Sequence, residues 1–137
     1  MNTPLLLDTC ACLWIVADEL SDSAVAALGS AFDAGISIFV SPITAWEVGT
    51  LARKGRFKSH LRPQRWFEKL MSAPGTALAE MTPELLLESS FLPGNLHKDP
   101  ADRILAATAR QYGYTLMTRD RALLDYARQG HLSVLEC

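Results

Sequence analysis

PLLLD, residues 4–8, is the stretch that indicates how this chain folds, because it is a compact apolar run that ends in an acid. A second run, SIFVSP at 37–42, is rich in β-branched and aromatic residues and ends in a serine and a proline that suit a helix start. Both runs are typical of a short buried strand that leads into a helix. The predicted strands are 4–8, 37–42, 76–83, 114–120 and 132–136.

Helical stretches separate these runs. Several of them end at a glycine, such as Gly35, Gly55, Gly113 or Gly130, where a C-terminal cap is expected. Strands that alternate with helices indicate a parallel sheet covered on both faces. We therefore predict an α/β fold of three layers, with a central parallel sheet of about five strands and helices on both faces. The predicted helices are 9–17, 23–34, 43–54, 63–71, 84–91, 100–112 and 121–129.

Length and composition indicate one globular domain, residues 1–137. The chain is 49% hydrophobic and 20% charged, which excludes a disordered tail. Its first residues lack a basic region, and Asp8 interrupts their apolar run, so we expect neither a signal peptide nor a membrane span. Cys10, Cys12 and Cys137 form no zinc-ligand spacing, which favours reduced thiols in the cytoplasm. Cys10 and Cys12 are interpreted as small hydrophobes near a helix start.

A basic strip at 53–69 contrasts with the rest of a chain whose net charge is −2. The strip carries seven basic residues against the single acid Glu68, and Trp66 and Phe67 lie within it. One interpretation is a solvated charged face, and the other is a local grip on a phosphate backbone. The basic residues are Arg53, Lys54, Arg56, Lys58, Arg62, Arg65 and Lys69.

Acidic residues follow three of the predicted strands or open the helices beside them, at the sheet edge where open α/β sheets bind ligands. Asp8 ends the first strand, and Asp120 lies two residues past TLM. Glu47 lies in the second turn of the helix after the second strand, which its neighbours Trp46 and Val48 indicate to be largely buried. Asp102 opens the helix that leads to the fourth strand.

Each acid alone has a structural explanation, because Asp8 and Asp120 suit helix caps and Glu47 suits an exposed helix position. Together they present a problem of charge. Two like charges about 4 Å apart repel by roughly 1 kcal/mol in bulk water and by about 4 kcal/mol at an effective dielectric near 20. Either some acids are protonated, or a hard divalent cation lies among them. Oxygen ligands without Cys or His select Mg²⁺ or Mn²⁺.

The segment LHKDPADRILAATA, 96–109, poses the same choice within one helix start. Asp99 suits the N-cap, and Pro100 suits the first helical position, where its missing N–H costs nothing. Asp102 then lies in the positively polarised first turn, so its charge complements the helix dipole or faces a metal ion. The segment by itself does not separate these alternatives.

The chain resembles PIN-domain ribonucleases of the VapC toxin type. The matching blocks are LLLDT, SPITAWEVGTLARKGR, LPGNLHKDPADRILAATA and TLMTRD, and they run nearly end to end. They carry Asp8, Glu47, Asp102 and Asp120, together with His97, Asp99, Arg103 and Thr118.

The resemblance implies a Mg²⁺- or Mn²⁺-dependent endoribonuclease whose catalytic and metal site is the four acids. It also implies an RNA substrate, a homodimer and a cognate VapB-like antitoxin. Thr9 and Thr118 are supporting candidates that orient a carboxylate or hold a metal-bound water, and Asp99 is mainly a cap. His97 is interpreted as structural or substrate-contacting rather than as a ligand. Ala101 departs from the pattern, because a large aromatic is expected there.

Two other enzyme classes fit less well. A receiver domain needs an acidic pair after the first strand, an Asp after the third and a Lys after the fifth, which this sequence lacks. A haloacid-dehalogenase-like phosphatase needs D-x-D, where this chain has DTCAC. The non-enzymatic alternative is an RNA- or partner-binding α/β module whose acids are helix caps.

Overall fold

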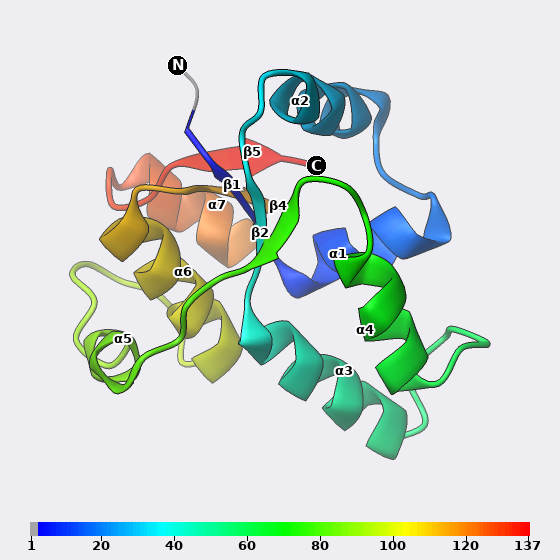
Figure 1. Ribbon diagram of the computed structural model, residues 1–137. Helices are drawn as coiled ribbons and strands as arrows, with labels where there is room; N and C mark the ends of the chain where they lie inside the picture. The colour runs from blue at the N-terminus through cyan, green and yellow to red at the C-terminus, as the bar shows by residue number, and fades with distance from the viewer. Residues whose placement is uncertain (1–2) are drawn as a thin grey trace.

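The computed structural model describes residues 3–137, which contain the five predicted strands in one parallel sheet (Figure 1). The strand order is β3-β2-β1-β4-β5. Leu6 at the centre of β1 pairs with Phe39 of β2 on one side and with Leu116 of β4 on the other. The strands are β1 (Leu5–Leu7), β2 (Ile38–Val40), β3 (Thr76–Leu78), β4 (Thr115–Thr118) and β5 (Val134–Glu136).

The order of the strands creates a switch point between β1 and β4. From β1 the chain adds β2 and β3 on one side, and it then crosses to the other side for β4 and β5. Connections leave β1 and β4 in opposite directions, and the position beyond their carboxyl ends is the topological crevice in which α/β proteins place their ligands. The residues that follow β1 and β4 are Asp8 and the segment 119–120.

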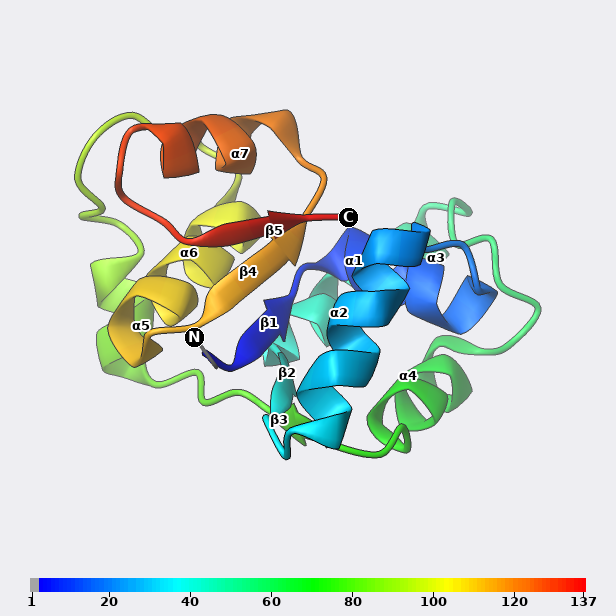
Figure 2. The same cartoon turned by 90° about the horizontal axis from the view of Figure 1, so that it is seen from above.

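Helices cover both faces of the sheet, as predicted. Figure 2 shows α1, α2 and α4 on one side of the sheet and α5, α6 and α7 on the other. In the part of the chain that the structure describes, no helix is long and apolar enough to cross a membrane. The helices are α1 (Thr9–Ala17), α2 (Asp22–Asp33), α3 (Pro42–Arg53), α4 (Pro63–Met71), α5 (Pro83–Glu88), α6 (Pro100–Tyr112) and α7 (Arg121–Arg128).

Local capping explains why the helices begin where they do. Side-chain oxygens of the N-cap residues accept hydrogen bonds from free N–H groups of the first turn. Proline occupies the first turn of α3, α4, α5 and α6. Gly113, with φ of 71°, ends α6 in the left-handed conformation that glycine adopts without strain. The side-chain caps are Asp8, Ser21, Ser41, Thr82, Asp99 and Asp120.

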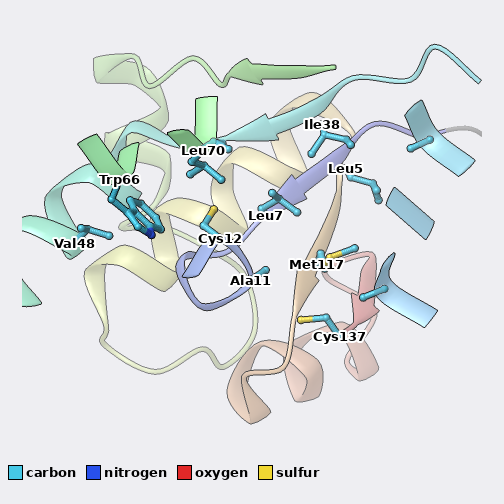
Figure 3. Close-up of a cluster of buried hydrophobic side chains, with 13 residues drawn as sticks. Leu5, Leu7, Ala11, Cys12, Ile38, Val48, Trp66, Leu70, Met117 and Cys137 are labelled. Carbon is cyan, nitrogen blue, oxygen red and sulfur yellow. The ribbon is translucent and has the colours of Figure 1, made fainter. Parts of the chain in front are cut away.

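Two apolar cores lie on opposite faces of the sheet, because side chains alternate along each strand. Leu5 and Leu7 of β1 join the core beneath α1, α2 and α4, whereas Leu6 joins the core beneath α5, α6 and α7. Figure 3 shows the first of these cores, in which Trp66 of α4 and Leu7 belong to one cluster. The helix α3 contributes to both cores, through Val48 and Ile43.

All five strands and the helices α5 and α7 are shorter than predicted. The helix α5 ends at Glu88 rather than at 91, because the Ser89 hydroxyl bonds the Leu86 carbonyl and the Ser89 carbonyl accepts from Arg103. The strand β3 ends at Leu78 rather than at 83, since it is an edge strand from which the chain departs to begin α5. Ala101 is buried in the core, so a small residue fills the position where an aromatic was expected.

Three aromatic and thiol positions correct the sequence-based interpretations. Trp46 is 59% exposed, so it does not bury the Glu47 helix as predicted. Trp66 is 1% exposed because the amphipathic helix α4 turns it into the core, and it is not available to the basic strip. Cys12 is buried as predicted, but Cys10 lies on the exposed side of α1. All three cysteines are free thiols.

Replacing Trp66 by alanine tests the core assignment. The ring packs edge-on against Phe57, with centroids 5.9 Å apart, so Trp66→Ala should lower the free energy of unfolding by about 3–5 kcal/mol. The exposed Trp46 provides a matched control, and Trp46→Ala should change it by less than about 0.5 kcal/mol. Urea denaturation measures both variants. Equal losses at the two positions would contradict the burial described here.

Candidate metal centre

Asp8 is held rigidly at the end of β1. Its backbone N–H continues the sheet by donating to the Met117 carbonyl at 3.1 Å. Its carboxylate accepts from the Ala11 N–H at 2.7 Å, which caps α1, and from the Thr118 hydroxyl at 2.5 Å. Asp8 is therefore both a helix cap and a buried acid fixed by a neighbouring strand.

Thr118 joins Asp8 to the next acid. Its hydroxyl donates to Asp8 Oδ2 and accepts from the Asp120 N–H at 3.0 Å. The Asp120 carboxylate caps α7 by accepting from the Leu123 N–H at 3.0 Å. The acids that follow β1 and β4 thus lie on either side of one buried threonine.

Glu47 points from α3 toward α1, where the Thr9 hydroxyl donates a short hydrogen bond to its Oε1. The Thr9 hydroxyl also lies 3.2 Å from that of Thr44. These contacts orient the Glu47 carboxylate toward the crevice, although no sequence signal singles out Thr44. Thr9, a predicted supporting residue, therefore contacts both Glu47 and Thr44.

Asp99 and Asp102 have different environments at the start of α6. Asp99 Oδ1 accepts from the backbone N–H groups of Ala101 and Asp102, at 3.0 and 3.2 Å, so Asp99 is the N-cap. The Asp102 side chain caps nothing and is only 18% exposed. Its carboxylate faces His97, whose Nε2 is 3.0 Å from Asp102 Oδ2 and 4.0 Å from Asp120 Oδ2.

Arg103 does not neutralise this cluster. Its guanidinium donates to the carbonyl oxygens of Ser89 and Leu96, at 2.9 and 3.0 Å, and so anchors the loop that precedes α6. Within residues 3–137, no lysine or arginine nitrogen lies within 4.0 Å of the carboxylates of Asp8, Glu47, Asp102 or Asp120. The charges therefore remain unbalanced by any strong cationic partner.

The acids perturb one another. Burial, reinforced by the charge of Asp99 and then by those of Asp120, Glu47 and Asp8, raises the pKa of Asp102 to about 8. Burial also raises the pKa of Asp8 and of Glu47, although the hydrogen bonds from Thr118 and Thr9 oppose these shifts. Although Cys10 is exposed, partial desolvation of its sulfur, together with the nearby acids, raises the pKa of the thiol to about 11. The crevice disfavours negative charge and is suited to a cation.

The donor set fits a divalent cation. Ligand atoms of His97, Asp102 and Asp120 lie within 4.8 Å of one another, and Asp8 and Glu47 are electrostatically coupled to the same group. Carboxylate oxygens are the ligands preferred by Mg²⁺ and Mn²⁺, and the threonine hydrogen bonds hold two of them in place. An ion here would offset the burial and the charge repulsion that together raise the pKa of Asp102.

The basic strip lies apart from the acids, at the end of α3, along 54–62 and on α4. Its basic side chains are exposed, as a charged face requires. Trp66 is buried in the core and Phe67 packs against the same core, so neither ring is presented between the charges. The aromatic part of the phosphate-grip interpretation is therefore wrong, and the charges alone remain.

Comparison with known proteins decides the family. A family model described as the PIN domain matches residues 5–129. The chain belongs to the PIN-domain family. It is 30% identical over 124 residues to ribonuclease VapC22 of Mycobacterium tuberculosis, covering 90% of this chain and 92% of that protein. The predicted family is confirmed.

Solved structures share the PIN-domain fold. A VapBC2 structure from Rickettsia felis, bound to a promoter DNA fragment, matches 96% of this chain and 97% of its own with a TM-score of 0.70 at 16% identity. A DNA-bound VapBC from Salmonella typhimurium matches 98% of both chains with a TM-score of 0.65 at 18% identity. At these identities the comparison supports the fold, and the predicted α/β class is confirmed.

The pKa of Asp102 makes a prediction about the metal-free PIN domain. The unfolded chain loses this proton near pH 3.8, but the folded chain keeps it to about pH 8, so folding stability should fall as pH rises between these values. Asp102→Asn removes that loss. With chelator present, the melting temperature of the variant should exceed that of the wild type by a margin that widens from pH 5 to pH 8. A margin independent of pH would contradict the raised pKa of Asp102.

Proposed function

We propose that this PIN domain is a metal-dependent endoribonuclease that hydrolyses phosphodiester bonds in RNA, and that it is the toxin of a toxin–antitoxin pair. Asp8, Glu47, Asp102 and Asp120 would hold a Mg²⁺ or Mn²⁺ ion. When bound, such an ion supplies a polarised phosphate oxygen and an activated water. The chain itself contributes carboxylates fixed by Thr9 and Thr118 at the β1–β4 crevice.

The environment of Asp102 is the observation that carries the proposal. Its side chain is mostly buried, caps no helix and has no lysine or arginine partner among residues 3–137, and its pKa is raised to about 8. A carboxylate held there for structure alone would destabilise the fold, because no interaction would offset the cost of its burial. A divalent cation resolves the conflict, and perturbed carboxyl groups in a crevice are typical of functional sites.

The alternative is a non-catalytic module whose acids are helix caps. The structure supports part of this reading, because Asp8, Asp99 and Asp120 all cap helices. Caps do not account for Glu47 or Asp102, which accept no N–H group of a helix start. The M. tuberculosis relative is named a ribonuclease, which also favours the enzyme.

In this proposal the protein acts in the cytoplasm. Its partners are RNA, a VapB-like antitoxin and a second copy of the chain. The exposed basic strip, with Arg53, Lys54, Arg56, Lys58, Arg62 and Arg65, suits contact with RNA phosphates or with acidic residues of an antitoxin. The solved VapBC structures support an antitoxin partner. Exposed Leu87 and Phe91, at and beyond the end of α5, suit burial in a homodimer.

Metal dependence is tested on Asp102 with Asp99 as its matched control. Asp102→Asn should fold and lose cleavage of total RNA by a factor of at least about 100, because a carboxamide is a poor substitute for an anionic ligand. Asp99→Asn keeps the oxygen that caps α6, so it should retain most activity. Chelation should abolish wild-type cleavage, and added Mn²⁺ should restore it.

Two outcomes would overturn this assignment. Full cleavage in the presence of chelator would remove the metal from the proposal. An active Asp102→Asn beside an inactive Asp99→Asn would show that the roles of the two aspartates are reversed. Melting curves of both variants separate loss of activity from loss of fold.

The salt dependence of RNA binding tests the basic strip. Each phosphate contacted contributes about 0.7 to the slope of log affinity against log salt for a single strand. The triple change of Arg56, Lys58 and Arg62 to alanine should therefore reduce the slope by roughly 2. Arg128→Ala, on the exposed side of α7, is the control and should leave the slope unchanged. An unchanged slope in the triple variant would indicate that the strip is a solvated charged face that does not contact RNA phosphates.

A further inference from the structure

His97 lies inside the acidic cluster, although its sequence-based interpretation is a structural or substrate-contacting residue rather than a metal ligand. Its Nε2 is 3.0 Å from Asp102 Oδ2 and 4.0 Å from Asp120 Oδ2. Ligand atoms around a zinc-sized ion lie about 2.0–2.2 Å from it, so neighbouring ligand atoms are about 3–4 Å apart. The two distances from Nε2 to the carboxylate oxygens therefore match neighbours in one coordination shell, and all three ligand atoms lie within 4.8 Å of one another.

The backbone holds His97 in this place. Arg103 donates to the Leu96 carbonyl at 3.0 Å and to the His97 carbonyl at 3.5 Å, so a charged side chain of α6 anchors the loop. His97 Nδ1 faces the Asp99 N–H at 3.4 Å, a long contact. Asp99 in turn caps α6, which carries Asp102. The imidazole and the Asp102 carboxylate are thus presented from one connected unit.

We infer that His97 Nε2 is a ligand of the metal, and that it shifts the preference of the site from Mg²⁺ toward Mn²⁺ and other first-row transition ions. The inference rests on the proposed metal site and replaces the sequence-based interpretation of His97. Imidazole suits transition ions, whereas Mg²⁺ prefers oxygen. Binding requires an unprotonated Nε2, so Nδ1 carries the imidazole proton once the ion enters, and the long contact in which Nδ1 accepts from the Asp99 N–H is lost.

Two other roles make different predictions. If His97 only donates a hydrogen bond to Asp102, its loss should weaken Mg²⁺ and Mn²⁺ equally. If His97 only takes the place of a cation while no metal is bound, its removal should strengthen the binding of both Mg²⁺ and Mn²⁺. A ligand role predicts a selective loss of Mn²⁺.

The test uses the full chain with Mn²⁺ and Mg²⁺ alone, without RNA. The electron paramagnetic resonance signal of free Mn²⁺ measures its affinity, and competition measures that of Mg²⁺. His97→Asn keeps an acceptor near the Nδ1 position and removes Nε2. It should lower Mn²⁺ affinity at least about tenfold and Mg²⁺ affinity less than about threefold. His60→Asn, at an exposed histidine of the basic segment, is the control and should change neither.

Pulsed resonance of bound Mn²⁺ gives a second readout that requires no variant. The wild type should show coupling to an imidazole nitrogen that persists in His60→Asn and disappears in His97→Asn. Mn²⁺ binding that is lost in Asp102→Asn, but without nitrogen coupling in the wild type, would overturn the ligand role and leave the proposed function intact. A wild type that binds no Mn²⁺ would overturn both.

Discussion

Repulsion among carboxylates at the carboxyl ends of β1 and β4 is the constraint on which the site depends. The parallel order β3-β2-β1-β4-β5 makes these two strands neighbours, so the residues that follow them meet in one crevice. Thr118 is placed between Asp8 and Asp120 and bonds both. The hydrogen bonds that hold the acids oppose the raised pKa of Asp8 and Glu47 but do not remove it. The fold thus gathers carboxyl groups in surroundings that disfavour their charge, and within residues 3–137 it places no lysine or arginine nitrogen within 4.0 Å of them.

Helix capping and the proposed metal binding use the same residues in this protein. Asp8 and Asp120 each satisfy free N–H groups of a helix, and their remaining capacity as acceptors faces the crevice. A cap fixes the backbone position of the carboxylate, and the start of a helix tolerates negative charge. Capping therefore offsets part of the cost of gathering acids, so a structural role for an aspartate does not argue against a functional one. Asp102, which has no cap to form, distinguishes the two roles most clearly.

The basic strip shows how one helix serves two surfaces. On α4, Trp66 and Leu70 face the core, whereas Arg65 and Lys69 face solvent. A linear count of residues places the aromatic rings among the charges, but the helical period separates them onto opposite faces. Any nucleic-acid contact along this strip therefore depends on charge rather than on stacking.

The sequence by itself determined the elements, because short apolar strands, caps and prolines are local signals. The sequence also identified the candidate acidic residues, because each of them lies in a recognisable block that follows a strand or begins a helix. Only the tertiary structure decided which groups meet. The strand order brought Thr118 to Asp8 across 110 positions, the α1–α3 packing brought Thr9 to Glu47, and the loop anchored by Arg103 brought His97 to Asp102. The tertiary structure also buried Trp66 and left Trp46 exposed. Such contacts join residues distant in sequence, or depend on which side of a helix faces its neighbours, and a local pattern carries information on neither.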